Sequence, residues 1–276
     1  MYDKIYIITK SRRDLNFLKD TCEIVKFKKM ENFEFFANDN ELVFFFPDGK
    51  EIKNPPKIYA KNILNFNLEA IKTCSNKIEC RRKLEMSNAP IPKTWYRIQN
   101  ARVPYIIRRE YHSMGMGLQI IRKGRDHRQQ ERIIKNKHRL YFSELIDVEK
   151  EYRAFVLDGQ IFLIFDRDWQ GDIESTLKQR ESVRANMLDF NRREASNEIS
   201  KEHRQLCIDA TKAVDLDYGA VDFVIDKSGK LYVLEINTTP FMNGQIVKDA
   251  LIKAFEDLKN GIPITPFKYE VENDGK

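Results

Sequence analysis

The stretch that decides the fold runs from Tyr218 to Pro240 and reads YGAVDFVIDKSGKLYVLEINTTP. Two apolar runs flank Lys227-Ser228-Gly229-Lys230, and this pattern predicts a β-hairpin with a four-residue turn. With that turn, Asp222 lies opposite Glu235 on the paired strand. Asn237 shares their face because the side-chain period of a strand is two. The hairpin is therefore expected to gather two carboxylates and one amide on one side.

Two carboxylates that face each other on a sheet need a counter-ion. The four-residue turn places Asp226 opposite Leu231, and counting back along both strands places Asp222 opposite Glu235. Like charges in such a pair repel each other, and a desolvated carboxylate without a partner is costly. A divalent cation removes both problems, and Mg²⁺ prefers a few carboxylate oxygens plus substrate phosphates. The alternative is an edge hairpin with a wet face, whose carboxylates contact water, Lys or Arg.

Composition narrows the class of protein. The 276 residues are 42% hydrophobic and 33% charged, which is typical of a globular protein with one elaborate domain or two small ones. There is no apolar run of about 18 residues, and the N-terminus enters a strand without a signal-peptide pattern. The four cysteines show no CxxC spacing and the four histidines form no ligand pair. We therefore expect a cytoplasmic protein with reduced thiols and without zinc.

Positive charge is concentrated in the middle of the chain. Residues 97–139 contain 12 Lys and Arg against 3 acidic residues. Such a segment favours an anionic partner, which could be nucleotide phosphates, an acidic substrate or a nucleic acid. For residues 122–139 the alternative is a solvated helical face.

Apolar periodicity predicts an alternating series of strands and helices along the chain. Asp158-Gly159 is a two-residue hairpin signal, and Ser200 is a suitable helix N-cap. The predicted strands are 4–9, 23–28, 41–46, 104–109, 118–121, 140–146, 151–157, 160–165 and the two strands of the hairpin; the predicted helices are 13–21, 67–87, 125–137, 200–214 and 244–259.

The order of these elements, together with the D…LEINTTP pattern, resembles the ATP-grasp superfamily. That superfamily includes D-alanine–D-alanine ligase, glutathione synthetase and the ligases that add glutamate to ribosomal-protein tails. The resemblance implies an α/β (α+β) ATP-grasp fold, in which two α+β lobes sandwich the nucleotide and a small N-terminal α/β domain precedes them. The implied domains are 1–75, the N-terminal domain; 76–143, the small lobe with a glycine-rich loop; 144–262, the large lobe with the metal site; and 263–276, a C-terminal tail.

The same resemblance assigns the metal ligands and a lysine. It implies that Asp222, Glu235 and Asn237 hold Mg²⁺ against the ATP phosphates. The stretch SNKIECRRKLEMSNAPIPKTW is similar to the family's helix that begins with a lysine near the phosphates. Lys77 takes that role, and the alternative is an ordinary surface lysine.

The stretch PYIIRREYHSMGMGLQII is similar to the family's strand end and mobile glycine-rich loop. In that loop the backbone approaches phosphate closely, which suits glycine. The resemblance implies nucleotide contacts from Ser113, Gly115 and Gly117. Arg108 stands where the family usually has a lysine. It keeps the charge, but its planar fork is not equivalent to a point-like ammonium.

The stretch LYFSELIDVEKEYRAFVLDG looks like the family's hinge between lobes. The resemblance places adenine contacts at Glu144, Leu145 and Ile146 and the ribose at Glu151. Arg153 shares the strand face of Glu151, where an arginine facing a nucleotide would meet phosphate. The alternative for Arg153 is a cross-strand ion pair with a carboxylate.

A further stretch resembles the glutamate-adding ligases in part. Arg167 and the later Arg184-Ala185-Asn186 are similar to the arginine and the Arg-Ser-Asn of those enzymes. The resemblance makes Arg167, Arg184 and Asn186 candidates for stabilising a transferred phosphoryl group, with surface arginines as the alternative. The family's following Gly-Gly is replaced by Leu188-Asp189-Phe190-Asn191, so the substrate half of the site is not carried over.

The resemblance implies an ATP-dependent ligase that joins a carboxylate to an amine through an acylphosphate and releases ADP and phosphate. The implied cofactors are ATP and Mg²⁺, as two ions that Mn²⁺ can replace. The implied partners are small-molecule or peptide carboxylates and amines, with an acidic or nucleic-acid acceptor left open, no membrane, and a homodimer allowed.

Three other functions compete with the ligase. One is a nucleotide-binding module that no longer catalyses, which the change to Arg108 favours. Another is an ATP-grasp kinase of a hydroxyl acceptor, with Asp166 or Asp168 as its base. The third is a nucleic-acid-binding protein built on the basic segment, although the aromatic residues of that segment do not interleave with its charges.

Overall fold

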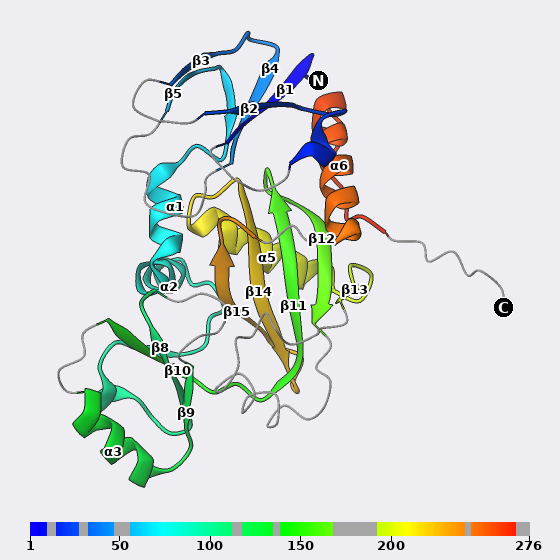
Figure 1. The fold of residues 1–276 in the computed structure, drawn as a ribbon. Coiled ribbons are helices and arrows are strands. Elements are labelled where there is room, and N and C mark those ends of the chain that lie inside the picture. Colours follow the sequence, from blue (N-terminus) through cyan, green and yellow to red (C-terminus); the bar gives the residue numbers. More distant parts are fainter. Residues whose placement is uncertain are drawn as a thin grey trace, which may run out of the picture.

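In the computed structural model, the strands form three larger sheets and one two-stranded ladder within the described part of the chain. One sheet lies at each end of the molecule and the largest lies between them (Figure 1). None of the helices in the described ranges is long and apolar enough to cross a membrane. The described residues are 1–9, 15–27, 33–46, 56–111, 118–134, 139–167, 192–240 and 244–268.

The N-terminal unit is a parallel sheet in the order β2-β1-β4-β6, accompanied by the parallel ladder β3–β5. The helix predicted at 13–21 is only a 3-10 turn, η1 (Asn16–Leu18), in its described part. The strands are β1 (Lys4–Thr9), β2 (Glu23–Lys26), β3 (Glu34–Phe36), β4 (Glu41–Phe46), β5 (Lys57–Tyr59) and β6 (Asn62–Leu64).

The single helix predicted at 67–87 is two helices, α1 (Leu68–Ser75) and α2 (Lys77–Met86). Asn76 separates them because its backbone is extended and its side chain accepts hydrogen bonds from the N–H groups of Ile78 and Glu79. An Asn in this conformation is a favoured N-cap. The break therefore makes Lys77 the first residue of a new helix.

The small lobe is an antiparallel sheet in the order β7-β10-β8-β9, covered on one face by α3. Its apolar core contains Tyr105, Ile107, Ile121 and Phe142 with Ile134 of α3. The elements are β7 (Thr94–Trp95), η2 (Ile98–Asn100), β8 (Tyr105–Arg109), β9 (Gln119–Ile121), α3 (Gly124–Ile134) and β10 (Leu140–Glu144).

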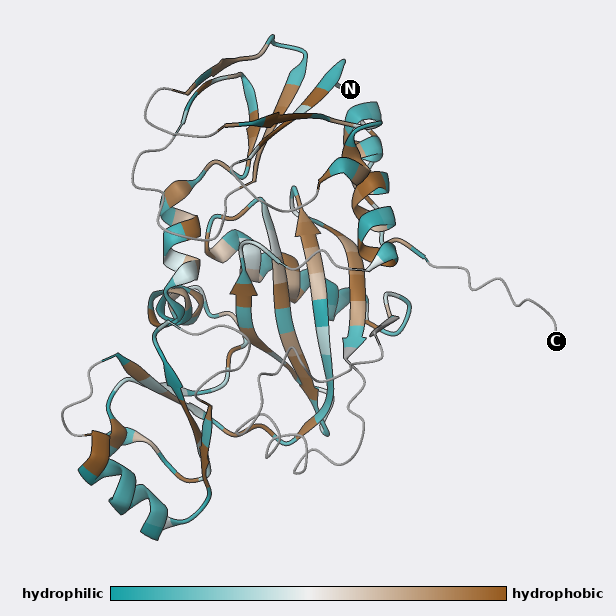
Figure 2. Cartoon of the chain, in the orientation of Figure 1, coloured by the Kyte–Doolittle hydropathy of each residue, from teal (hydrophilic) through white to brown (hydrophobic). Residues whose placement is uncertain are grey.

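The large sheet is antiparallel, in the order β13-β12-β11-β14-β15. Alternation along β11 sends Tyr152 and Ala154 into the core shared with α5, and Phe155 and Leu157 into the core shared with α6. Apolar residues accordingly run along its strands (Figure 2). The elements are β11 (Val148–Leu157), β12 (Gln160–Arg167), β13 (Arg192–Glu194), α5 (Lys201–Ala213), β14 (Tyr218–Asp226), β15 (Leu231–Asn237) and α6 (Gln245–Asn260).

The N-terminal sheet and the large sheet share one aromatic core. The Phe44 ring of β4 meets the Tyr218 ring of β14 edge-on, with centroids 5.4 Å apart. It meets the Phe255 ring of α6 in the same way at 5.3 Å. Edge-to-face pairs at such distances are favourable beyond the area they bury. Residues from three distant parts of the sequence therefore stabilise each other.

The four cysteines are buried free thiols, and this predicts slow reaction with thiol reagents. Burial raises the pKa of Cys22 to about 12 and also raises the pKa of Cys207. We expect the native protein to leave all four thiols unmodified by a chromogenic disulfide reagent over minutes. In the denatured protein, all four thiols should react with the reagent. Rapid modification of any thiol in the native protein would contradict the described packing.

Candidate active site

The hairpin of β14 and β15 pairs Asp222 with Glu235, as predicted, although the register next to the turn differs from the prediction. The turn is Lys227-Ser228-Gly229-Lys230, as predicted, because β14 ends at Asp226 and β15 begins at Leu231. The register beside it differs by one residue, since Ile225, not Asp226, lies opposite Leu231. The N–H of Asp226 donates to the carbonyl oxygen of Lys230, so the hydrogen bond that closes the turn lies one residue earlier than predicted. The side chain of Asp226 stabilises this turn by accepting hydrogen bonds from the N–H groups of Ser228 and Lys230. A bulge in β15 then restores the pairing.

The bulge leaves Leu234 without a partner on β14, because Phe223 pairs with Val233 while Asp222 pairs with Glu235. One extra residue in a strand in this way bends the strand and shifts its side chains. Here the shift corrects the register by one residue. It thereby returns Glu235 to the face that Asp222 occupies.

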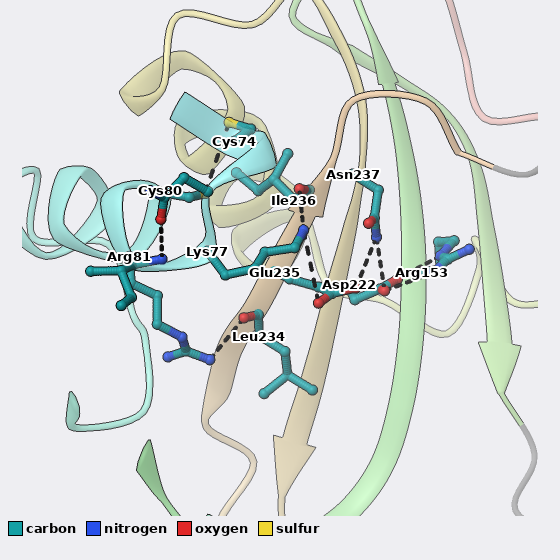
Figure 3. A network of polar contacts seen from close by, with 12 residues as sticks. Cys74, Lys77, Cys80, Arg81, Arg153, Asp222, Leu234, Glu235, Ile236 and Asn237 are labelled. Atoms are coloured by element: carbon teal, nitrogen blue, oxygen red, sulfur yellow. Dashed lines mark hydrogen bonds and ion pairs between the residues drawn. The ribbon is translucent and has the colours of Figure 1, made fainter. Parts of the chain in front are cut away.

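The two carboxylates converge on the amide of Asn237 (Figure 3). Its Nδ2 donates to Asp222 Oδ2 at 3.1 Å and to Glu235 Oε1 at 3.2 Å. Asp222 is only 3% exposed. A rotated amide would present its oxygen instead, which completes a set of hard oxygen donors suited to Mg²⁺. Among the described residues, no group of three or more His, Cys, Asp or Glu could hold a metal ion, so an ion here needs further oxygens from phosphate or water.

Arg153 pairs with a carboxylate of this set. It lies on β11 directly opposite Asp222 of β14. Its Nε donates to Oδ1 at 2.5 Å and its Nη2 donates to Oδ2 at 2.7 Å. The ion pair with a carboxylate across the strands, one of the two alternatives from the sequence, is thus present.

Lys77 is buried and reaches the same strand from α2. Its Nζ donates to the carbonyl oxygen of Ile236 at 3.3 Å and lies 3.9 Å from Glu235 Oε2. Burial alone lowers the pKa of this ammonium, whereas the negative charge of Glu235 raises it, and the net pKa is raised. The surface-lysine alternative therefore fails, because Lys77 is a buried cation beside one of the predicted metal ligands.

Arg81 is a residue of this region that the sequence reasoning missed. Its Nη2 donates to the carbonyl oxygen of the bulged Leu234 at 2.8 Å, and its Nη1 donates to Thr94 Oγ1 at 3.2 Å. Its guanidinium lies 5.1 Å from the centre of the Tyr141 ring. Arg81 thus connects α2, the small-lobe sheet and β15. The available signal was its position one helical turn after Lys77, which places both residues on one helix face.

The start of α2 is also connected to the segment predicted as the glycine-rich loop. The N–H of Lys77 donates to the carbonyl oxygen of Glu110 at 2.9 Å. Asn76 Nδ2 donates to Glu110 Oε1 at 2.6 Å. Ser113, Gly115 and Gly117 lie outside the described residues, so their predicted phosphate contacts stay predictions.

Two further predicted nucleotide contacts lie on strands of the two lobes. Arg108 of β8 pairs with Tyr141 of β10, so both share the sheet face on which Arg81 lies. Glu151 is buried on β11, two residues before Arg153, and therefore shares the sheet face of Asp222.

The predicted hinge follows the small lobe directly. Glu144 ends β10 and is exposed, while Leu145 and Ile146 lead into β11. The N–H of Glu144 donates to the carbonyl oxygen of Lys93 at 2.9 Å, which connects it to the start of the lobe. This chain segment passes from one sheet to the other, as the hinge prediction requires.

The remaining predicted residues lie apart from this cluster or outside the described part. Asp166 of β12 pairs with Tyr152 and therefore lies on the sheet face opposite to Arg153 and Asp222. Arg167 ends β12, but its side chain is outside the described part. Asp168, Arg184 and Asn186 lie wholly outside the described residues.

Known proteins share both sequence and fold with this chain. The probable alpha-L-glutamate ligase of Parasynechococcus marenigrum (strain WH8102) is 31% identical over 96 residues, which cover 34% of this chain and 18% of that protein. The ATP-grasp ligase PsnB, solved with a phosphomimetic variant of a minimal precursor, Mg and ADP, superimposes with a TM-score of 0.52 and 17% identity. That match covers 72% of this chain and 62% of PsnB.

A D-alanine–D-alanine ligase from Bacillus anthracis, solved with ATP, superimposes with a TM-score of 0.54 and 14% identity. That match covers 94% of this chain and 99% of the ligase. The chain spans less than two thirds of the length of PsnB and less than a fifth of the glutamate ligase. The profile of the RimK-like ATP-grasp domain matches residues 75–258, which include Asp222, Glu235 and Asn237. The chain therefore belongs to the RimK-like ATP-grasp family.

Proposed function

We propose that this protein is an ATP-dependent ligase that joins a carboxylate to an amine through an acylphosphate. The observation that carries the proposal is the convergence of Asp222, Glu235 and Asn237 on one face of the large sheet. Membership of the RimK-like ATP-grasp family supports it. The released products are ADP and phosphate, because the substrate carboxylate attacks the γ-phosphate and the amine then displaces that phosphate.

Asp222, Glu235 and Asn237 would hold Mg²⁺, which supplies charge neutralisation at the nucleotide phosphates. The protein contributes positioning and positive charge, since phosphoryl transfer needs little covalent chemistry from it. Arg108 would meet the phosphates from the small lobe, and Glu151 would hold the ribose. The loop with Ser113, Gly115 and Gly117 would cover the phosphates and exclude water, which otherwise hydrolyses an acylphosphate.

The kinase alternative needs a base beside the acceptor, and one of its two candidate bases is disfavoured. Asp166 lies on the sheet face opposite to Asp222, while Asp168 lies outside the described residues. The non-catalytic alternative predicts nucleotide binding without ADP release. We also propose that Arg167, Arg184 and Asn186 stabilise the transferred phosphoryl group and that two Mg²⁺ ions bind. The protein is proposed to be a cytoplasmic homodimer. Within each chain, the domain boundaries are proposed at residues 75, 143 and 262.

The names of similar proteins guide the choice of substrates. One relative is called a probable alpha-L-glutamate ligase, and PsnB was also solved with a precursor peptide. We propose L-glutamate and acidic peptides as the first acids and amines to test. The basic surface supports an acidic acceptor, since Arg125, Arg128 and Arg132 of α3 are exposed and lie along one helix face.

The test is release of ADP in the presence of Mg²⁺, ATP and pairs from a panel of acids and amines. A ligase releases ADP fastest when both members of one pair are present, and a mass increase identifies the joined product. Nucleotide binding without ADP release for any pair would favour the non-catalytic module. Transfer of phosphate to a hydroxyl would favour the kinase.

A further inference from the structure

Arg153 holds both oxygens of the Asp222 carboxylate in a fork. The Nε to Oδ1 distance is 2.5 Å and the Nη2 to Oδ2 distance is 2.7 Å, as in a bidentate charge-assisted pair. The side chain of Asp222 is 5% exposed and that of Arg153 is 18% exposed. A bidentate ion pair in this largely buried environment fixes the plane of the carboxylate and also compensates its charge.

The fork restricts how a cation can approach Oδ2 of Asp222. A carboxylate oxygen has about two lone-pair sites. Oδ2 uses one for Arg153 and the other for Asn237 Nδ2, which lies 3.1 Å away. A cation on Oδ2 must therefore replace the Asn237 amide, and not Arg153. This direction faces Glu235, because the same Nδ2 lies 3.2 Å from Glu235 Oε1.

Each carboxylate of the cluster already has a cation beside it. Arg153 pairs with Asp222, and Lys77 lies 3.9 Å from the carboxylate of Glu235 (Figure 3). A divalent ion entering alone would add two positive charges beside these two cations, which is unfavourable. Nucleotide phosphates that enter with the ion supply the missing negative charge.

We propose that Arg153 is the resident counter-ion of the metal site and a positioning residue for Asp222, so that Mg²⁺ binds together with nucleotide and not alone. This inference rests on the proposed function, because it takes Asp222, Glu235 and Asn237 as metal ligands. It differs from a direct phosphate contact by Arg153. In the metal-free protein Arg153 compensates Asp222, and in the loaded protein it keeps Oδ2 aimed at the ion.

Arg153→Gln should make the nucleotide-free protein gain stability from Mg²⁺, which the wild type does not. Removing one partner of a buried ion pair leaves an uncompensated charge, so the melting temperature in metal-free buffer should fall by about 5 °C or more. Free Mg²⁺ without nucleotide should then restore much of that loss. The wild type should shift by less than about 1 °C under the same conditions. Arg153→Lys keeps the charge and should resemble the wild type in its response to free Mg²⁺.

The experiment is thermal unfolding of chelator-treated protein at rising MgCl₂ and constant ionic strength, without nucleotide. Arg82→Gln is the matched control, because Arg82 also pairs with a carboxylate, Glu79, but at the surface; it should leave both the melting temperature and the Mg²⁺ response unchanged. The inference is overturned if Arg153→Gln responds to free Mg²⁺ no more than the wild type does. It is also overturned if the wild type responds as strongly as the variant.

A double variant covers the case in which Arg153→Gln does not fold at any Mg²⁺ concentration. Arg153→Gln with Asp222→Asn removes both charges together, so it should fold and show no response to free Mg²⁺. Failure of the double variant to fold overturns the counter-ion role. A separate titration of the wild type with Mg²⁺ and a non-hydrolysable ATP analogue tests the proposed function. A shift there, without a free-Mg²⁺ response in Arg153→Gln, would reject this inference and leave the ligase proposal standing.

Discussion

Glu235→Gln is expected to abolish the stabilisation that Mg²⁺ and a non-hydrolysable ATP analogue give the wild type. Ligand at about 100 times its Kd adds roughly 2.7 kcal/mol to the free energy of unfolding, or roughly 5 °C in melting temperature for a chain of this size. The variant replaces the proposed anionic ligand of Mg²⁺ by a neutral amide. ADP release should also fall by at least about 100-fold, because charge neutralisation at the phosphates is lost.

The comparison must use the ligand-induced shift of each protein. Glu235→Gln also removes the charge beside the buried Lys77, which lowers the melting temperature even without ligand. Glu256→Gln on the exposed face of α6 is the matched control and should keep the full shift. A normal Mg²⁺-dependent shift in Glu235→Gln would show that the ion is not bound by this residue.

Phe44→Ala is expected to destabilise the whole molecule by about 3–5 kcal/mol, the usual cost of deleting a fully buried phenylalanine. Phe44 lies in the N-terminal sheet, but its ring packs on Tyr218 of the large sheet and on Phe255 of α6. The shared core predicts that both sheets unfold in one transition. Circular dichroism during urea unfolding should therefore show a single transition, shifted to lower urea in the variant.

Phe36→Ala is the control of the same type. Phe36 is 69% exposed and stacks only on the ring of Tyr59 within the described part. Its loss should change the free energy of unfolding by about 0.5 kcal/mol or less. Two separate transitions in Phe44→Ala, with the large sheet at its wild-type midpoint, would instead mean that the N-terminal unit folds independently.

The carboxylate pair was predictable because strand alternation is a local rule. The apolar runs on each side of Lys227-Ser228-Gly229-Lys230 defined the hairpin, and they placed Asp222, Glu235 and Asn237 on one face. The register beside the turn was wrong by one residue, since the N–H of Asp226 bonds to Lys230 and Ile225 lies opposite Leu231. The bulge at Leu234 cancelled that error. A bulge depends on contacts at the outer edge of β15, which the sequence does not reveal.

The cations of the site were harder to place because their partners are distant in sequence. Arg153 contacts Asp222 across 69 residues, and Arg81 contacts Leu234 across 153 residues. Only the pairing of whole strands and the docking of α2 bring them together. The same reason applies to Asp166, whose face is set by its pairing with Tyr152. The break at Asn76 was also missed, although an asparagine N-cap is a local signal that could have revealed it.

The transfer of ¹⁸O from a labelled substrate carboxylate to inorganic phosphate tests the central claim most directly. If the carboxylate attacks the γ-phosphate and the amine then displaces phosphate, one labelled oxygen leaves with each phosphate released. The measurement uses the first acid and amine pair that releases ADP, and mass spectrometry of the phosphate. We predict one ¹⁸O per phosphate in the wild type. Release of unlabelled phosphate would contradict the carboxylate–amine ligase account. Transfer of phosphate to a hydroxyl, with the labelled acid not joined to the amine, would also contradict it.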